Sequence, residues 1–162
     1  KFLGFNIPNN NLDSEIDDSK IINDQLIFLQ NTLDTIEDSK NIIIMTHKLI
    51  WLYGNNEINL YGEERSNVKV GFNKWNIKAN NFYNDIYPSL IRKESKGINV
   101  YCVAGDLGTN SSIFEFQSKE GINFLANGIG DDLSKDKMLV IRNLNSVISW
   151  EFIPVDNLID LF

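Results

Sequence analysis

The sequence has few of the residues that define several specialised classes of protein. Only one cysteine, Cys102, occurs in 162 residues, which excludes an internal disulfide framework and a cysteine-rich zinc site. No apolar run approaches the roughly 18 residues that a membrane-spanning helix needs. The longest run, Ile42–Met45, has the length of a strand. We therefore expect a soluble chain with no membrane segment, and the sequence leaves its compartment open.

Positive charge is also scarce. The chain has 15 Lys and Arg against 22 Asp and Glu, which gives a formal net charge of -7. Nucleic acids and anionic lipids are bound through clustered basic side chains, so we expect no nucleic-acid-binding surface. The hydrophobic fraction of 43% and the charged fraction of 23% are those of an ordinary globular protein. They predict a single domain over residues 1–162.

Helical periodicity marks the stretch that begins near Ile22. Apolar residues recur there at intervals of three and four, which places them on one face of a helix: Leu26, Leu29, Leu33 and Ile36. The segment Asn41–Thr46 follows. It is rich in β-branched residues and apolar on both faces, as strands buried in parallel sheets are. The sequence therefore predicts a helix followed by a buried strand.

A second helix and strand are predicted further along the chain. Apolar spacing indicates a helix from Phe82 to Leu90, in which Pro88 should start, kink or interrupt the helix. The segment Ile98–Ala104 is again apolar on both faces and predicts the second buried strand. Residues 51–80 lack sustained periodicity. They predict a long loop of a kind that is often functional.

After Gly105 the apolar residues alternate with polar ones. This period of two predicts four short, mostly antiparallel strands over residues 113–117, 122–126, 138–141 and 147–152. The predicted fold class is therefore α/β, with βα units followed by an antiparallel β meander.

Two polar residues follow the ends of the two buried strands. His47, the only histidine of the chain, follows Thr46, and Asp106 follows Gly105. Ligands of open α/β sheets bind beyond the carboxyl ends of the strands, so neighbouring strands would bring His47 and Asp106 into one crevice. Imidazole and carboxylate together suit Mn, Fe or Zn. A structural role stays open, with His47 as a capping or core histidine and Asp106 as a turn residue.

The same segments resemble a known family. The stretch Ile42–Trp51, an apolar strand that ends in Thr-His, is similar to the strand-then-histidine segment of calcineurin-like metallophosphoesterases. The helical stretch Gln25–Leu33 resembles the helix before that strand. The stretch Val100–Gly108 falls where the family carries its Gly-His-x-His motif. The order of elements, including the closing β meander, agrees over nearly the whole chain.

The resemblance implies half of a four-layer α/β/β/α sandwich. In the family this sandwich holds two divalent metal ions about 3.5–4 Å apart, which bridge a phosphate and generate a nucleophilic hydroxide. The resemblance makes His47 a metal ligand, with Mn, Fe or Zn as the metal. Asp106 stands where the family has a histidine and becomes a possible substitute ligand. Gly108 stands at the second motif histidine and cannot bind a metal.

The family's other ligand motifs, Asp-x-His, Gly-Asp-x-x-Asp and Gly-Asn-His, do not occur in this sequence. We therefore expect the C-terminal part of a phosphoesterase domain whose metal-binding half lies upstream. The complete enzyme would hydrolyse a phosphorylated small molecule or a phosphodiester, and this chain alone would be inactive. A non-catalytic binding or interaction domain on a degenerate phosphoesterase scaffold is the alternative. An unrelated α/β domain that binds a small ligand at the same sheet edge is a third.

Two further features have structural interpretations. Cys102 lies in the middle of a predicted strand among apolar neighbours, which favours a buried small hydrophobe over a nucleophile. The segment Gly128–Asp132 could cradle an anion with its backbone N–H groups, but its two aspartates would repel phosphate. A solvated hairpin turn is the favoured interpretation there.

Overall fold

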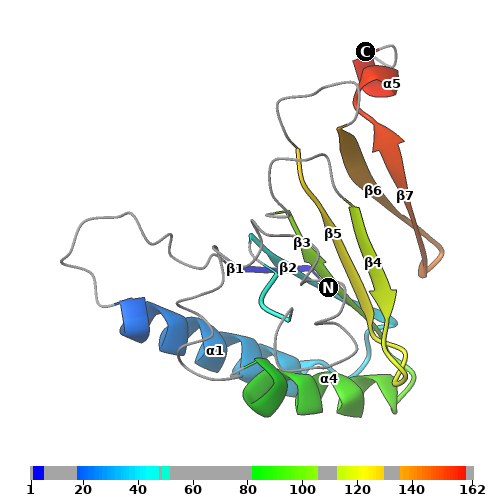
Figure 1. Cartoon of the computed structure of the whole chain (residues 1–162). Helices are drawn as coiled ribbons and strands as arrows, with labels where there is room; N and C mark the ends of the chain where they lie inside the picture. The colour runs from blue at the N-terminus through cyan, green and yellow to red at the C-terminus, as the bar shows by residue number, and fades with distance from the viewer. Residues whose placement is uncertain are drawn as a thin grey trace.

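The backbone forms one five-stranded sheet and a separate two-stranded hairpin (Figure 1). The structure is a computed structural model that describes residues 2–5, 18–47, 49–51, 82–105, 113–129 and 136–159. The predicted loop over residues 51–80, apart from Trp51, lies outside these ranges, as do residues 130–132 of the predicted turn. The strands are β1 (Phe2–Phe5), β2 (Asn41–Thr46), β3 (Asn99–Ala104), β4 (Ile113–Gln117), β5 (Asn123–Asn127), β6 (Lys137–Leu144) and β7 (Val147–Pro154). The helices within the described ranges are α1 (Asp18–Thr35), the π-helix η1 (Phe82–Ile86), α4 (Tyr87–Glu94) and the short α5 (Asp156–Ile159).

The two strands predicted to be buried are neighbours. The sheet order is β1-β2-β3-β5-β4, in which β1, β2, β3 and β5 are parallel and β4 is an antiparallel edge. Strand β2 pairs with β3 from Asn41 opposite Asn99 to Thr46 opposite Ala104. This pairing confirms that the predicted strands lie side by side in parallel.

Both faces of β2 and β3 are covered, because alternate side chains enter two different cores. Ile42 and Ile44 of β2 pack in the core on the helical side, together with Cys102 of β3. Ile43 of β2 and Tyr101 of β3 pack in the core on the opposite side. The run of apolar residues that predicted these strands follows from this two-sided burial.

Helices α1 and α4 lie side by side on one face of the sheet (Figure 1). The predicted apolar stripe of α1 faces the core, where Leu29 and Leu33 are fully buried. The side chain of Gln30 donates from Nε2 to the backbone oxygen of Asp85 over 2.9 Å, which ties α1 to η1. Within the described residues, the structure has no helix of the length and apolar character needed to cross a membrane.

The second predicted helix consists of two parts. A π-helical turn, η1, passes into α4, and Pro88 lies in the first turn of α4. Proline is tolerated there because the first N–H groups of a helix have no intrahelical partner. The expectation that Pro88 marks a start or an interruption is therefore confirmed. At the other end of α4, the buried Lys93 donates from Nζ to the backbone oxygen of Ile36 over 2.6 Å, just beyond α1.

The prediction that the last four strands form one β meander is wrong. All four strands exist, but β5 pairs in parallel with β3 and β4 pairs with β5, so both complete the main sheet. Only β6 and β7 form a separate hairpin. The physical reason lies in β5, where Phe124, Leu125 and Ala126 are buried on both faces. Such a strand belongs inside a sheet, whereas a period of two identifies strands without identifying their partners.

The β6–β7 hairpin covers the face of the sheet opposite the helices (Figure 1). Its inner side chains, Leu139, Ile141, Ile148 and Trp150, pack on the second core. The ring of Trp150 lies edge-on to Tyr101 with centroids 5.8 Å apart. At the tip of the hairpin, Asn41 donates from Nδ2 to the backbone oxygen of Ser146 over 2.7 Å. The described part of the chain is thus a mixed α/β fold of three layers: the helices, the mixed parallel and antiparallel sheet, and the hairpin.

The core beneath α1 should dominate the stability of the helical layer. We expect Leu29→Ala to lower the free energy of unfolding by about 2–5 kcal/mol, because it leaves a cavity at a position that is 0% exposed. The adjacent Phe28 is 52% exposed. Phe28→Ala should therefore change the free energy by less than about 0.5 kcal/mol. Urea unfolding of both variants measures the difference, and equal losses would contradict the burial of this helix face.

The turn of the hairpin requires a backbone conformation that glycine adopts most easily. Asn145 and Ser146 have φ angles of 52° and 67°. A two-residue turn with both φ angles positive matches the twist of the flanking strands, and Asn-Gly is its preferred sequence. Ser146→Gly should raise the free energy of unfolding by about 0.5–1 kcal/mol. The control is Ser149→Gly, which should lower the free energy of unfolding because it places glycine within strand β7. Thermal unfolding of both variants measures the two effects. A shift of both midpoints in the same direction would contradict the turn geometry.

Candidate functional site

Strands β2, β3 and β5 are parallel and end at the same edge of the sheet, here called the carboxyl edge. His47 and Gly105 follow β2 and β3 there. The N–H of Gly105 donates to the backbone oxygen of His47 over 3.3 Å, so the pairing of the two strands continues one step beyond their ends. His47 is an exposed residue at this edge. The only histidine of the chain therefore lies beside the residue that precedes Asp106.

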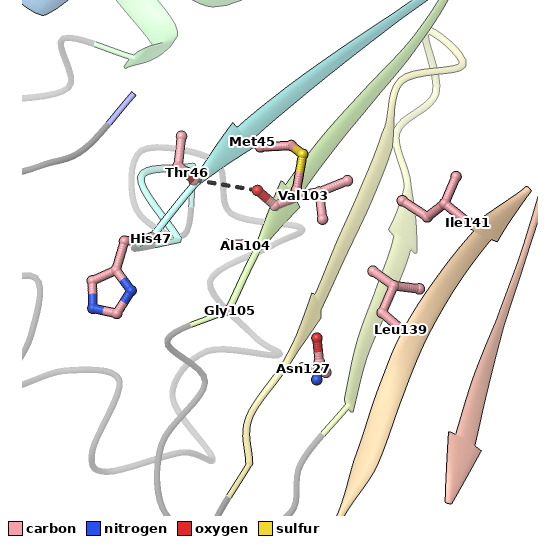
Figure 2. Close-up of a pocket in the computed structure, with 9 residues that line it drawn as sticks. All are labelled: Met45, Thr46, His47, Val103, Ala104, Gly105, Asn127, Leu139 and Ile141. Atoms are coloured by element: carbon pink, nitrogen blue, oxygen red, sulfur yellow. Dashed lines mark hydrogen bonds between the residues drawn. The ribbon is translucent and has the colours of Figure 1, made fainter. Parts of the chain in front are cut away.

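A cavity of about 430 Å³ lies between the carboxyl edge and the hairpin. The ends of β2, β3 and β5 form one side, and β6 forms the other (Figure 2). Its volume is within the range of about 300–1,000 Å³ that is usual for small-molecule pockets. Parallel α/β sheets bind ligands at this edge, so the cavity is the candidate site in the described part of the chain.

Apolar side chains form most of the described wall. Met45 and Val103 come from the sheet, and Leu139 and Ile141 come from β6 (Figure 2). Met45 is 45% exposed, although its neighbour Ile44 in β2 is almost completely buried. Methionine is flexible and polarisable, which allows its side chain to adapt to ligands of different shape. The cavity thus offers two opposite apolar surfaces.

A few polar groups complete the wall. The side chain of Asn127, at the end of β5, donates from Nδ2 to the backbone oxygen of Lys137 over 2.9 Å. Its Oδ1 points toward the apolar side chains (Figure 2). The hydroxyl of Thr46 donates to the backbone oxygen of Val103 over 3.4 Å. The ring of His47 lies beyond the end of β2 and is directed away from the apolar side chains (Figure 2).

The predicted metal ligands are only partly placed by the structure. His47 is at the predicted edge, whereas Asp106 lies outside the described residues. Among the residues that the structure describes, no group of three or more His, Cys, Asp or Glu side chains could hold a metal ion. A metal centre requires at least three protein ligands in most sites. The described residues alone therefore do not fit a dimetal centre.

Sequence reasoning missed the residues that form the cavity wall. Asn127 could have been found, because it is a polar residue at the end of a third apolar strand and is followed by Gly128. The sequence around Leu139 and Ile141 shows only the alternation of apolar and polar residues that is typical of a half-buried strand. That alternation shows which side chains share a face, but it does not show that the face lies opposite β2 and β3.

Comparisons of this chain with models of protein families, with curated proteins and with solved structures gave no match.

Cys102 is fully buried on the helical side of β3, as predicted from its apolar neighbours. Burial disfavours the charged thiolate and raises the pKa of this thiol well above its usual range. The thiol is therefore a packing group in the folded protein.

We expect the Cys102 thiol to react with Ellman's reagent only after unfolding, because the reagent requires an accessible thiolate. Absorbance at mildly alkaline pH should show no fast release of thionitrobenzoate from native protein, and one equivalent in guanidinium. The exposed position Ser149 supplies a control, since Ser149→Cys should react at once in the native state. A fast reaction of the unmodified native protein would contradict the burial of Cys102.

Proposed function

We propose that this chain is the C-terminal part of a phosphoesterase that hydrolyses phosphate mono- or diesters, and that the carboxyl edge belongs to its active site. The observation that carries the proposal is the hydrogen bond of 3.3 Å from the Gly105 N–H to the His47 oxygen. It brings together the two segments that resemble the ligand-bearing segments of calcineurin-like metallophosphoesterases. A cavity of suitable size for an organic group adjoins them.

The layer arrangement supports the same proposal. Helices α1 and α4 cover one face of the sheet, and the β6–β7 hairpin covers the other. We propose that these are three layers of an α/β/β/α sandwich, in which the hairpin belongs to the second sheet. The outer side of the hairpin carries exposed apolar residues, Leu144 and Val147, which is compatible with further structure on that side.

Hydrolysis of a phosphate ester consumes one water molecule, forms a bond between its oxygen and phosphorus, and breaks the bond between phosphorus and the ester oxygen. The alcohol leaves with a proton, together with phosphate from a monoester or a phosphate monoester from a diester. Among the described residues of the carboxyl edge, His47 has an imidazole that can donate a hydrogen bond to a phosphoryl oxygen or bind a metal ion. The family resemblance assigns Mn, Fe or Zn to His47 and Asp106. Because the described residues do not supply three ligands, such a centre needs ligands from outside them.

A second candidate function is non-catalytic binding on the same scaffold. The observation that favours it is the lack of a metal-ligand cluster within the described residues, next to a cavity whose wall is mainly apolar. A domain of this kind would bind a small molecule at the carboxyl edge without turnover. The two functions differ in one measurable property, the hydrolysis of phosphate esters by the full-length protein.

We expect His47→Ala to lower hydrolysis of aryl phosphate mono- and diesters by the full-length protein by more than about 100-fold, because it removes a group that contacts the phosphate or its metal. Asp106→Ala should cost less, because Asp106 stands where the family has histidine. Initial rates during a Mn²⁺ titration measure both effects. Retained Mn²⁺ content in His47→Ala would show that His47 is no metal ligand.

The matched control is Lys96→Ala, which alters an exposed residue in the turn before β3, at the opposite edge of the sheet. The Lys96→Ala variant should hydrolyse both esters at the rate of the unmodified protein. Thermal unfolding should give similar midpoints for all three variants. If His47→Ala retained full activity, the catalytic site would not be at the carboxyl edge. If the unmodified full-length protein hydrolysed neither ester, the binding function would replace the enzymatic one.

A further inference from the structure

Nine described residues form the wall of the cavity with their side chains or backbone, and none of them is Asp, Glu, Lys or Arg. A charged ligand group inside the cavity would therefore lose its hydration without gaining an opposite charge from this wall, which is unfavourable. A phosphate or carboxylate consequently belongs outside the apolar part, toward the end of β2 where His47 lies (Figure 2). The group that enters the cavity should be uncharged.

The described side chains beside the apolar part of the cavity also offer few hydrogen-bonding groups. Asn127 has one amide hydrogen bond to the Lys137 oxygen, and Thr46 donates its hydroxyl to the Val103 oxygen. A sugar would bring several hydroxyl groups into contact with Met45, Leu139 and Ile141. Each hydroxyl without a partner costs the free energy of its lost hydration. The described side chains of the wall are therefore poorly suited to sugars and to the ribose of nucleotides.

Two apolar surfaces face each other across the cavity. Met45 and Val103 form the sheet side, and Leu139 and Ile141 of β6 form the hairpin side (Figure 2). An aryl ring that enters the cavity would contact apolar side chains of both layers. The thioether of Met45 adds a favourable sulfur–aromatic contact. Oδ1 of Asn127 points toward the same space and can accept one hydrogen bond from a ring substituent (Figure 2).

We propose that the cavity binds an aryl group that carries one hydrogen-bond donor, and that this group is the alcohol part of the phosphate ester. The second half of this statement rests on the proposed function, whereas the binding of the aryl group does not. The ring lies between Met45 and Leu139, its donor meets Asn127, and the ester oxygen is directed toward the carboxyl edge.

The test for binding is a fluorescence titration of the protein with 1-naphthol. Saturable binding is expected, and 5-amino-1-naphthol, whose amine is a donor separate from the hydroxyl that an ester would occupy, should bind roughly two- to tenfold more tightly. Met45→Glu should weaken 1-naphthol binding by about tenfold or more, because it places a carboxylate against the ring. The substitution is compatible with folding because Met45 is 45% exposed. Met45→Gln, which adds polarity without charge, should also weaken the binding of 1-naphthol.

Met138→Glu is the matched control. Met138 is 42% exposed and alternates with Leu139 along β6, so its side chain belongs to the face that points away from the sheet. The affinity of the Met138→Glu variant for 1-naphthol should stay within about twofold of that of the unmodified protein. Absence of saturable binding, or an equal loss in Met45→Glu and Met138→Glu, would overturn the assignment of an aryl site to this cavity.

Hydrolysis by the full-length protein separates the two proposals. If 1-naphthyl phosphate is hydrolysed with a lower KM than a sugar phosphate, and Met45→Glu raises that KM, both proposals are supported. If 1-naphthol binds at Met45 but no ester is hydrolysed, the proposed phosphoesterase function is wrong and the aryl site stands. If both esters are hydrolysed with equal KM and Met45→Glu has no effect, the aryl site is wrong and the phosphoesterase function stands.

Discussion

Burial of β2 and β3 on both faces is the constraint on which the rest of the structure depends. Their alternate side chains enter two cores, one beneath α1 and α4 and one beneath the β6–β7 hairpin. Neither core is complete without these strands, because Ile42 and Cys102 belong to the first and Ile43 and Tyr101 to the second. Apolar surface removed from water on both sides stabilises the three layers together.

The same constraint creates the candidate site. The strands end at the carboxyl edge, where the backbone oxygen of Lys137, at the start of β6, accepts a hydrogen bond from Asn127 at the end of β5. The second core is filled in its centre by Tyr101 and Trp150. Toward the carboxyl edge it opens into the cavity beside Met45. The cavity is thus the unfilled end of the second core, between the sheet and the hairpin. Its wall is mainly apolar because the side chains that form it belong to the inner faces of these two layers.

Much of the architecture could be predicted from single segments. The spacing of Leu29 and Leu33 identified the buried face of α1, and the apolar runs identified β2 and β3 as central parallel strands. Strand partners could not be predicted in the same way, because β5 and β4 join the main sheet through contacts that no local pattern encodes. The position of His47 followed from the carboxyl-edge rule. Asn127 and β6 were missed because their contribution depends on how the layers pack.

We propose that this protein holds its ligand at the carboxyl edge, between β2, β3 and β6. A crystal structure of the protein with 1-naphthylphosphonic acid, a phosphonate that cannot be hydrolysed, tests it most directly. We expect electron density for the ring between Met45 and Leu139, with the phosphonate toward the end of β2 near His47. A ring bound at another surface, with the space between Met45 and Leu139 free of ligand, would contradict it.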